Sequence, residues 1–407
     1  QSIGLRLNYT FSENSEAKAG VQIKELNIHP GELTPINASS SIDPLIIQNE
    51  KAREMGFYFQ HDFDIFTNFR MSYGLRYNIF QYLGANTVNM YDEDLVRITD
   101  NIIDQITFGK NEVINQYDGF EPRLAFRWSI NDGTSIKLGF NRMYQYIHLI
   151  TNTASIAPTD IWKLSDTYVK PQIATQYSVG FFKNFNDNST ETSVEVYYKN
   201  LDNVLEYKDG AQLILNENLE TELLSGDGKA FGIELYAKKT IGRLSGWASY
   251  TYSRSLRTVQ GAYPEERINQ GEEYPSNFDK PHDLTAVMEF NISRNTKFSS
   301  IFTYSTGRAV TFPGAKFKYS GREIAYFDTR NESRAPDYHR VDVSLTFKFR
   351  STKKLLQGNW VLSIYNLYGR KNAFYVFFDD VSGKPPQAYK LSVVGIPFPA
   401  LSYSFKF

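Results

Sequence analysis

The amino-acid sequence predicts an all-β fold: a transmembrane, antiparallel β-barrel with about fourteen strands in this chain. Three observations lead to this prediction. Apolar and polar residues alternate over unusually long stretches, short and long connections alternate along the chain, and the last strand ends on an aromatic residue. A barrel wall with lipid outside and water inside produces the alternation, and its two rims produce the alternating connection lengths.

Strict alternation makes one face of each predicted strand apolar and the other polar, because successive side chains of a strand point to opposite faces. The clearest case covers residues 341–350, where Val343, Leu345 and Phe347 alternate with Asp342, Ser344 and Lys348. The same pattern is found within residues 123–130, 176–181, 231–236, 283–292 and 401–407. About 9 to 11 tilted residues cross a bilayer, and the predicted strands reach that length.

The connections between these strands form two classes. Short ones contain tight-turn residues such as Asn131, Asp132 and Gly133, which favour hairpins. We expect short turns near residues 66–68, 131–133, 186–189, 240–243, 293–296 and 351–358. We expect long loops near residues 11–53, 84–118, 148–171, 210–227, 256–280, 306–337 and 379–386. Bacterial outer-membrane barrels have short turns on the periplasmic side and long loops outside, so the C-terminus is predicted on the periplasmic rim.

Composition excludes several other classes of protein. No run of eighteen apolar residues occurs and mean hydropathy is -0.42, so a helical membrane protein is excluded. Aromatic residues make up 15% of the chain, as suits a lipid-facing wall with interfacial girdles. The formal net charge of -1 gives no indication of nucleic-acid binding, and the absence of cysteine excludes disulfides and thiol chemistry.

The sequence shows no catalytic or metal-binding pattern. Its five histidines form neither a His-x-x-x-His nor a Glu-x-x-His arrangement, and no Gly-x-Ser-x-Gly elbow or phosphate-binding glycine loop is present. We therefore expect no enzyme, no metal and no cofactor. Alternation already begins at Ile3, Leu5 and Leu7 without a leader, so we expect an N-terminal part of the natural polypeptide to precede Gln1.

Three stretches resemble TonB-dependent outer-membrane receptors of the kind abundant in Bacteroidota. The first comprises residues 141–146, Pro158–Lys163 and Lys170–Gln172, and the second comprises residues 363–372 with Asn366 and Leu367. The third is the aromatic C-terminus with Tyr403, Phe405 and Phe407, which is similar to the signal that barrel-assembly machinery recognises.

The resemblance implies a barrel of about 22 strands filled by an N-terminal plug. Residues 1–407 would then be a partial outer-membrane β-barrel domain, with the plug and the first strands upstream. It also implies the partners: outer-membrane lipids of a Gram-negative bacterium, and a TonB-type energy-coupling protein that is engaged through the missing N-terminal part. A surface lipoprotein or another outer-membrane subunit is a further expected partner.

Candidate ligand-binding residues lie in the long loop after residue 141 and at its base. They are Arg142, Tyr144, Tyr146, His148 and Trp162. Aromatic faces suit sugars or chelates and arginine suits anions, although the same tyrosines and tryptophan could anchor the upper aromatic girdle. The predicted lumen-facing charges pair with each other or with plug residues: Glu195, Lys199, Glu234, Asp283, Glu289, Asp342 and Lys348.

The leading functional hypothesis is TonB-dependent uptake of a scarce solute, such as a siderophore, a cofactor, an oligosaccharide or a peptide. One alternative is a complete fourteen-stranded passive channel, in which the strand at Ile3 pairs with the strand at Leu401 to close the ring. Another is a barrel subunit that binds surface lipoproteins.

Overall fold

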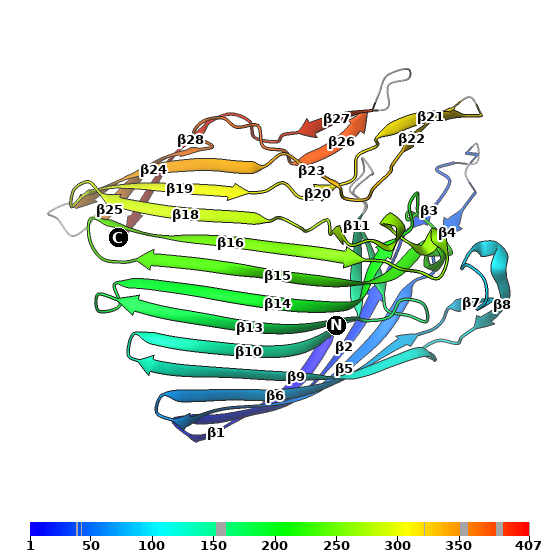
Figure 1. Ribbon diagram of the computed structural model, residues 1–407, viewed down its shortest axis with the longest axis horizontal. Helices are drawn as coiled ribbons and strands as arrows, with labels where there is room; N and C mark the ends of the chain where they lie inside the picture. Colours follow the sequence, from blue (N-terminus) through cyan, green and yellow to red (C-terminus); the bar gives the residue numbers. More distant parts are fainter. Residues whose placement is uncertain are drawn as a thin grey trace.

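The structure is a computed structural model that describes residues 1–37, 40, 41, 43–151, 160–320, 322–350, 357–379 and 386–406. A large antiparallel sheet dominates it, and short hairpins extend the long connections (Figure 1). Its helical segments are single 3-10 turns: η1 (Thr99–Asn101), η2 (Leu219–Thr221), η3 (Pro264–Glu266) and η4 (Asn269–Gly271). In the part of the chain that is described, no helix has the length and apolarity to cross a membrane.

Within the described residues, the main sheet has sixteen strands, of which fifteen follow one another along a single path. β17 (Tyr274–Pro275) pairs off this path with β16. The path runs through β1 (Ser2–Ser12), β2 (Ser15–Ile28), β5 (Glu50–Phe66), β6 (Phe69–Leu83), β9 (Val113–Asn131), β10 (Thr134–Gln145), β13 (Gln172–Phe185), β14 (Thr190–Tyr207), β15 (Leu223–Lys239), β16 (Leu244–Thr258), β18 (His282–Asn291), β19 (Thr296–Ser305), β24 (Tyr338–Arg350), β25 (Gln357–Tyr365) and β28 (Phe398–Lys406). The predicted all-β antiparallel fold is confirmed.

The sequence reading missed β2. The predicted long loop over residues 11–53 is wrong, because β1 turns tightly into β2 and the true loop covers residues 29–49. Small residues obscure the alternation of β2. Ala19 faces outward between Leu7 of β1 and Phe59 of β5, and these larger neighbours cover the position.

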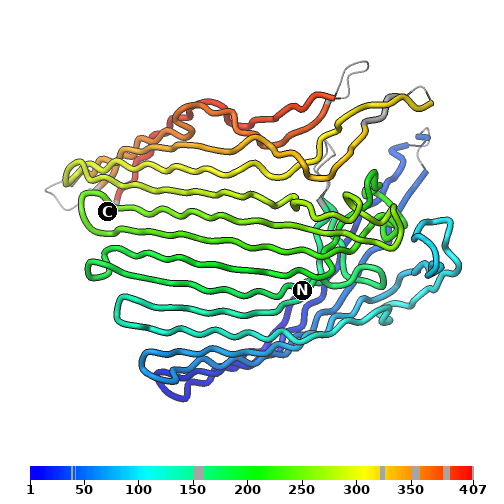
Figure 2. Tube along the Cα trace, viewed as in Figure 1, coloured from blue at the N-terminus to red at the C-terminus, as the bar shows by residue number. Residues whose placement is uncertain are grey.

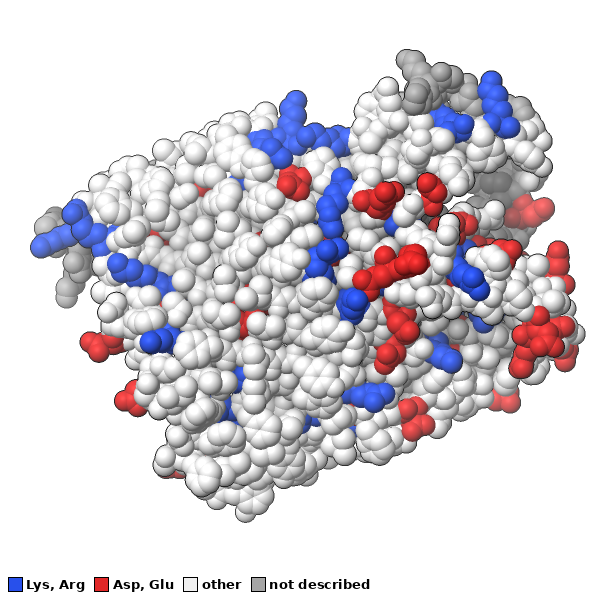
Figure 3. Space-filling view, viewed as in Figure 1, with Lys and Arg blue, Asp and Glu red and all other residues white. Residues whose placement is uncertain are grey.

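The outer face of the sheet is a continuous apolar surface. Leu5, Val21, Phe57, Tyr77 and Phe120 are successive register partners across five strands. At the other end of the path, the register brings together Leu345, Leu362 and Leu401. Many of these side chains are exposed, and one face of the molecule is largely free of charge over the strands (Figure 3). Such a surface is the lipid-facing band of a transmembrane barrel.

Short turns gather at one rim and long connections at the other (Figure 2). The long connections contain the hairpins β3 (Glu32–Leu33) with β4 (Leu45–Ile46), β7 (Thr87–Tyr91) with β8 (Ile102–Thr107), β11 (Ile147–Thr151) with β12 (Asp160–Leu164), β20 (Ala309–Val310) with β23 (Ser333–Arg334), β21 (Ala315–Tyr319) with β22 (Arg322–Tyr326), and β26 (Tyr375–Asp379) with β27 (Gln387–Leu391). Lys406 pairs with Gln357, so β28 ends at the rim of short turns as predicted.

β1 and β28 are the two ends of the pairing path. Over the described residues, β1 pairs with β2 alone and β28 pairs with β25 alone. The pairing between the strand at Ile3 and the strand at Leu401 that a complete fourteen-stranded ring requires is therefore not observed.

Candidate functional site

The β11–β12 hairpin packs against the inner face of the wall, close to the rim of long loops. Tyr146, which precedes the hairpin, stacks on Phe80 of β6 with ring centroids 4.6 Å apart and an angle of 2° between the planes. Leu164, at the end of β12, packs with them and with Ala52 and Tyr82 in one buried cluster. These residues fix the hairpin inside the mouth of the barrel.

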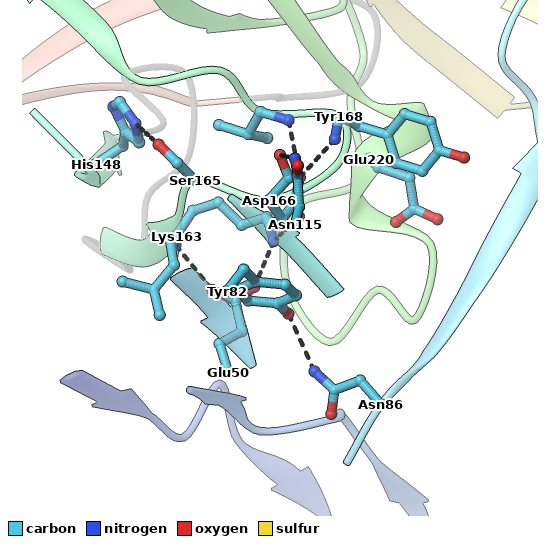
Figure 4. A network of polar contacts seen from close by, with 12 residues as sticks. Glu50, Tyr82, Asn86, Asn115, His148, Lys163, Ser165, Asp166, Tyr168 and Glu220 are labelled. Atoms are coloured by element: carbon cyan, nitrogen blue, oxygen red, sulfur yellow. Dashed lines mark hydrogen bonds and ion pairs between the residues drawn. The ribbon is translucent and has the colours of Figure 1, made fainter. Parts of the chain in front are cut away.

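A buried ion triad reinforces this attachment (Figure 4). Lys163 Nζ lies 2.5 Å from Glu50 Oε1 of β5 and 2.5 Å from Asp166 Oδ2. Glu50 also accepts a hydrogen bond from the backbone N–H of Leu164, and Asp166 accepts one from that of Val169. Burial alone lowers the pKa of Lys163, but the two carboxylates outweigh it and raise the pKa well above its usual value. Lys163 therefore stays protonated, and the two carboxylates of the triad balance its positive charge.

His148 lies on the buried side of the same hairpin. Its Nε2 is 3.1 Å from the hydroxyl of Ser165, and the side chain is almost fully buried. Burial, and secondarily the charge of Lys163, lowers the pKa of His148 to about 4. The imidazole is consequently neutral at physiological pH.

A cavity of about 960 Å³ opens beside this hairpin, and four long connections contribute to its lining. Side-chain amides are frequent in the lining: Gln48, Asn86, Asn89, Gln105, Asn216 and Asn218. Asn89 donates hydrogen bonds to Asn218 and to Glu220, which joins the second long connection to the fourth. The cavity walls are thus held together across segments that lie more than 100 residues apart in sequence.

The charges of the cavity are mainly negative. Glu217 and Asp160 are exposed carboxylates in the lining, and Glu220 accepts a hydrogen bond from Tyr91. Burial and the nearby Glu220 raise the pKa of Tyr91, so this tyrosine stays protonated as a donor. Lys163 also borders the cavity, but the triad already neutralises its ammonium.

The structure places the five predicted ligand-binding residues in three groups. Trp162 is 51% exposed and lines the cavity. Tyr146 and His148 are buried in the hairpin cluster, while Arg142 stacks over Tyr144 with 5.7 Å between the guanidinium carbon and the ring centroid. The structure therefore brings only Trp162 to the cavity, and the ligand-binding role of all five stays a prediction.

The base of the same loop departs from regular pairing. The β9–β10 register ends at Asn141, and Glu121 of β9 then accepts a hydrogen bond from the backbone N–H of Tyr144 at 2.9 Å. The Tyr144 ring lies against Gly119, where a Cβ would overlap it. The first family-like stretch thus forms the attachment of the loop, although Pro158 and Thr159 lie outside the described residues.

Two further ion-paired clusters join the later long loops at this rim. Asp279 is fully buried, accepts a hydrogen bond from Arg254 at 3.1 Å and pairs with Arg334. Arg330 pairs with Glu206 at 3.2 Å, and Glu206 also pairs with Arg257. These contacts hold the loops that follow β14, β16 and β19 in one assembly.

The other family-like residues have clear structural roles. Asn366 takes a left-handed backbone conformation with φ of 54°, and its buried amide donates to the carbonyls of Arg370 and Val394. Asn366 therefore shapes the start of the last long loop. Tyr403 and Phe405 lie on β28, and Phe405 is 50% exposed, whereas Phe407 lies outside the described residues.

Glu50 and Asp166 are the site residues that sequence reasoning missed. Lys163 was noted only as part of a family-like stretch, and its partner Glu50 is 113 residues away. No local pattern connects the two. Across the described residues, no group of three or more His, Cys, Asp or Glu side chains is arranged to hold a metal ion.

A family model described as "TonB dependent receptor-like, beta-barrel" matches residues 2–367 of this chain. No curated protein matches the chain.

Solved structures with the same fold are transporters from several bacteria. The FrpB iron transporter from Neisseria meningitidis (F5-1 variant) matches with a TM-score of 0.61 and 13% identity, over 100% of this chain and 55% of that one. The ferric-catecholate import receptor Fiu from K12 E. coli matches with a TM-score of 0.60 and 13% identity, over 100% and 54%. The ferric yersiniabactin uptake receptor FyuA from Yersinia pestis matches with a TM-score of 0.56 and 14% identity, over 100% and 54%.

Such low identities show the fold alone, and the chain spans about half the length of these structures. The family consists of transport proteins rather than enzymes, and its members lie in the outer membrane of Gram-negative bacteria. The match to the family model covers most of the sequence. The chain therefore belongs to the TonB-dependent receptor β-barrel family and is an outer-membrane protein.

Proposed function

We propose that residues 1–407 are the C-terminal barrel portion of a transporter that takes up a scarce solute by TonB-dependent active transport. The observation that carries this proposal is the cavity at the rim of long loops. At about 960 Å³ it has the size of a small-molecule site. It faces the side from which an outer-membrane receptor receives its solute.

The chemistry of the cavity narrows the class of solute. Amide side chains dominate its polar lining, and Trp162 offers an exposed aromatic face. Its lysine is neutralised, while Glu217 and Asp160 add negative charge. This combination favours a neutral or cationic polar solute, such as an oligosaccharide or a peptide, over an anionic siderophore.

Energy coupling requires parts that precede this chain. The proposed transporter has an upstream plug and first strands, and a TonB-type protein of the inner membrane acts through that upstream part. The aromatic residues Tyr403, Phe405 and Phe407 serve as the assembly signal. The assignment to a Bacteroidota-type receptor rests on the motif residues alone and stays a prediction.

Uptake measurements test this function. The full-length gene, with and without the upstream coupling segment, is expressed in a host that grows on a limiting oligosaccharide or peptide. We expect growth and radiolabelled uptake only with the coupling segment. Equal uptake in both strains would contradict energised transport.

A second candidate function is that of a barrel subunit that binds a surface lipoprotein. It is favoured by exposed apolar side chains that flank the last long hairpin, among them Phe374, which is 74% exposed, Val393 and Ile396. Co-purification of a lipoprotein at fixed stoichiometry, lost in Phe374→Asp, supports this role. Purification of the receptor without a lipoprotein excludes it.

A further inference from the structure

Three cationic side chains line one small recess at the rim of long loops. Arg97, Lys170 and Lys208 come from the second, third and fourth long connections. The recess has a volume of about 150 Å³, and among the described residues Glu266 is the one carboxylate in its lining. The lining therefore carries an excess of positive charge.

Contacts with the protein hold two of these cations in place. The guanidinium carbon of Arg97 lies 4.6 Å from the centroid of the Tyr168 ring, and its Nη1 donates a hydrogen bond to the carbonyl of Glu220 at 3.3 Å. Lys208 Nζ donates to the backbone carbonyl of Arg97 at 3.1 Å. Both residues are half-buried, so little side-chain freedom is lost when a ligand binds to them.

The cations of the recess are not neutralised by carboxylates. Within the part of the chain that the structure describes, Arg97, Lys170 and Lys208 form no ion pair. The nearby carboxylate of Glu220 accepts hydrogen bonds from Asn89 and Tyr91 instead. Charges removed from water are normally paired, and like charges in one recess repel each other. The electrostatics of the recess therefore favour an anion over a neutral or cationic ligand.

The size and the donors of the recess define the class of anion. Pockets for drug-sized ligands measure about 300 to 1,000 Å³, so a recess of 150 Å³ fits only a small group. Leu223 and Leu224 are buried and line the recess, and such an apolar boundary strengthens charge interactions. Ser225 adds a hydroxyl donor that has no other hydrogen-bond partner in the described structure. These features suit a compact oxyanion.

We propose that Arg97, Lys170 and Lys208 bind a phosphate group, either of free phosphate or of a lipid headgroup that carries a phosphate monoester. Such a group has a charge of about −1.5 to −2 near neutral pH and several acceptor oxygens. The forked N–H groups of Arg97 and the ammonium groups of the two lysines are the donors that recognise phosphate. This site is separate from the cavity proposed for the solute, and it does not depend on which solute is taken up.

The recess and the solute cavity nevertheless share a wall. Tyr168 lines both, and its hydroxyl donates to the backbone carbonyl of Asn89 in the cavity lining. Glu220 lines the cavity, while its backbone carbonyl accepts the hydrogen bond from Arg97. A phosphate group that binds Arg97 therefore stabilises this wall, and hydrogen exchange in residues 92–101 and 203–212 should slow when the group is bound.

Isothermal titration of the purified full-length receptor with inorganic phosphate tests the proposal. We expect R97Q and K208M to weaken binding at least about tenfold, because each substitution removes one charge-assisted contact. The variant R97K keeps the charge but loses the fork, so its affinity should lie between those of R97Q and the wild type. The matched control is K110M, which removes an exposed lysine of the same long connection outside the recess and should bind as the wild type does.

A second arm distinguishes the two sources of the phosphate group. The receptor is placed in nanodiscs of phosphatidylcholine with or without phosphatidic acid, and hydrogen exchange is followed in both. Protection that appears on addition of inorganic phosphate assigns the site to the free anion, and protection that requires phosphatidic acid assigns it to a lipid headgroup.

Three results overturn the proposal. The first is equal affinity in R97Q, K208M and K110M, and the second is the absence of both binding and protection in the two arms. The third is an equal response to potassium chloride at the same ionic strength, because that response reports charge screening rather than a phosphate site.

Discussion

Removal of the ammonium from the buried triad should release the β11–β12 hairpin from the wall. The substitution Lys163→Met keeps most of the apolar stem of the side chain but leaves Glu50 and Asp166 without their shared cation. All three side chains are nearly inaccessible to water. Solvent therefore cannot compensate for the loss.

The distances set the magnitude of this effect. Each carboxylate oxygen lies 2.5 Å from Lys163 Nζ, so the two oxygens are at most about 5 Å apart. Two unit charges at that separation repel by about 3 kcal/mol at an effective dielectric constant of about 20. Breaking a buried pair by removing one partner costs about 3 to 5 kcal/mol. Because Leu164 and Val169 still donate backbone hydrogen bonds to the carboxylates, we expect a loss of about 3 kcal/mol.

Hydrogen exchange with mass spectrometry measures this local loss. If the free energy of opening the hairpin falls by about 3 kcal/mol, amide exchange becomes roughly 100-fold faster. The increase should appear in peptides that cover β12 and residues 164–169, and it should be absent from the spanning part of β14. Heat denaturation of the whole barrel should change little.

Two variants separate electrostatics from lost packing. Lys170→Met removes an exposed lysine of the same connection that has no ion pair in the described structure, and its exchange should match the wild type. The double variant K163M/E50Q removes one of the two repelling charges and should recover most of the protection. Unchanged exchange in K163M, or no recovery in the double variant, would refute the electrostatic account.

Four further predictions concern the loops and the last strand. Trp162→Ala should weaken solute binding at least tenfold by isothermal titration without changing the circular dichroism spectrum; unchanged affinity argues against the cavity. Because the pKa of His148 is lowered to about 4, hairpin protection should be complete above about pH 6.5 and fall by about 3 kcal/mol toward pH 4, and His148→Gln should abolish that slope. Asn366→Ala should lower the free energy of opening the last loop by about 2 kcal/mol and so accelerate its proteolysis, and Asn366→Gly should lower it less because glycine accepts positive φ. Equal proteolysis rates for the two variants contradict the backbone argument. Phe405→Asn should reduce the amount of heat-modifiable, folded barrel in membranes, and an unchanged amount removes the assembly role.

The lipid-facing strands were predictable because every second side chain of such a strand faces lipid and is therefore apolar. Val343 and Phe347 face outward in register with Ile364 and Trp360, as the alternation around Asp342 required. Where small residues occupy the outer face, the local pattern fails although the strand forms. This happened in β2, where the side chains of neighbouring strands supply the apolar surface that Ala19 lacks.

The loop contacts were not predictable, because their energy comes from partners that are remote in sequence. Glu50 is the first residue of β5 and directly follows a long loop. No residue near it in sequence indicates that Lys163 will lie 2.5 Å away. Arg330 and Glu206 are a similar case, with 124 residues between them. Only the wall, by bringing the ends of distant strands to one rim, decides which loop charges meet.

Alternation nevertheless holds inside the loop hairpin and explains how it performs two tasks. Trp162 and Lys163 are neighbours on β12, and therefore point to opposite sides. The burial of the hairpin shows which side faces the wall, because His148, Ile150 and Lys163 are buried whereas Leu149 and Trp162 are exposed. Since Lys163 supplies the anchor, Trp162 is left exposed to the cavity, and a change that reverses the hairpin must lose both attachment and solute contact together.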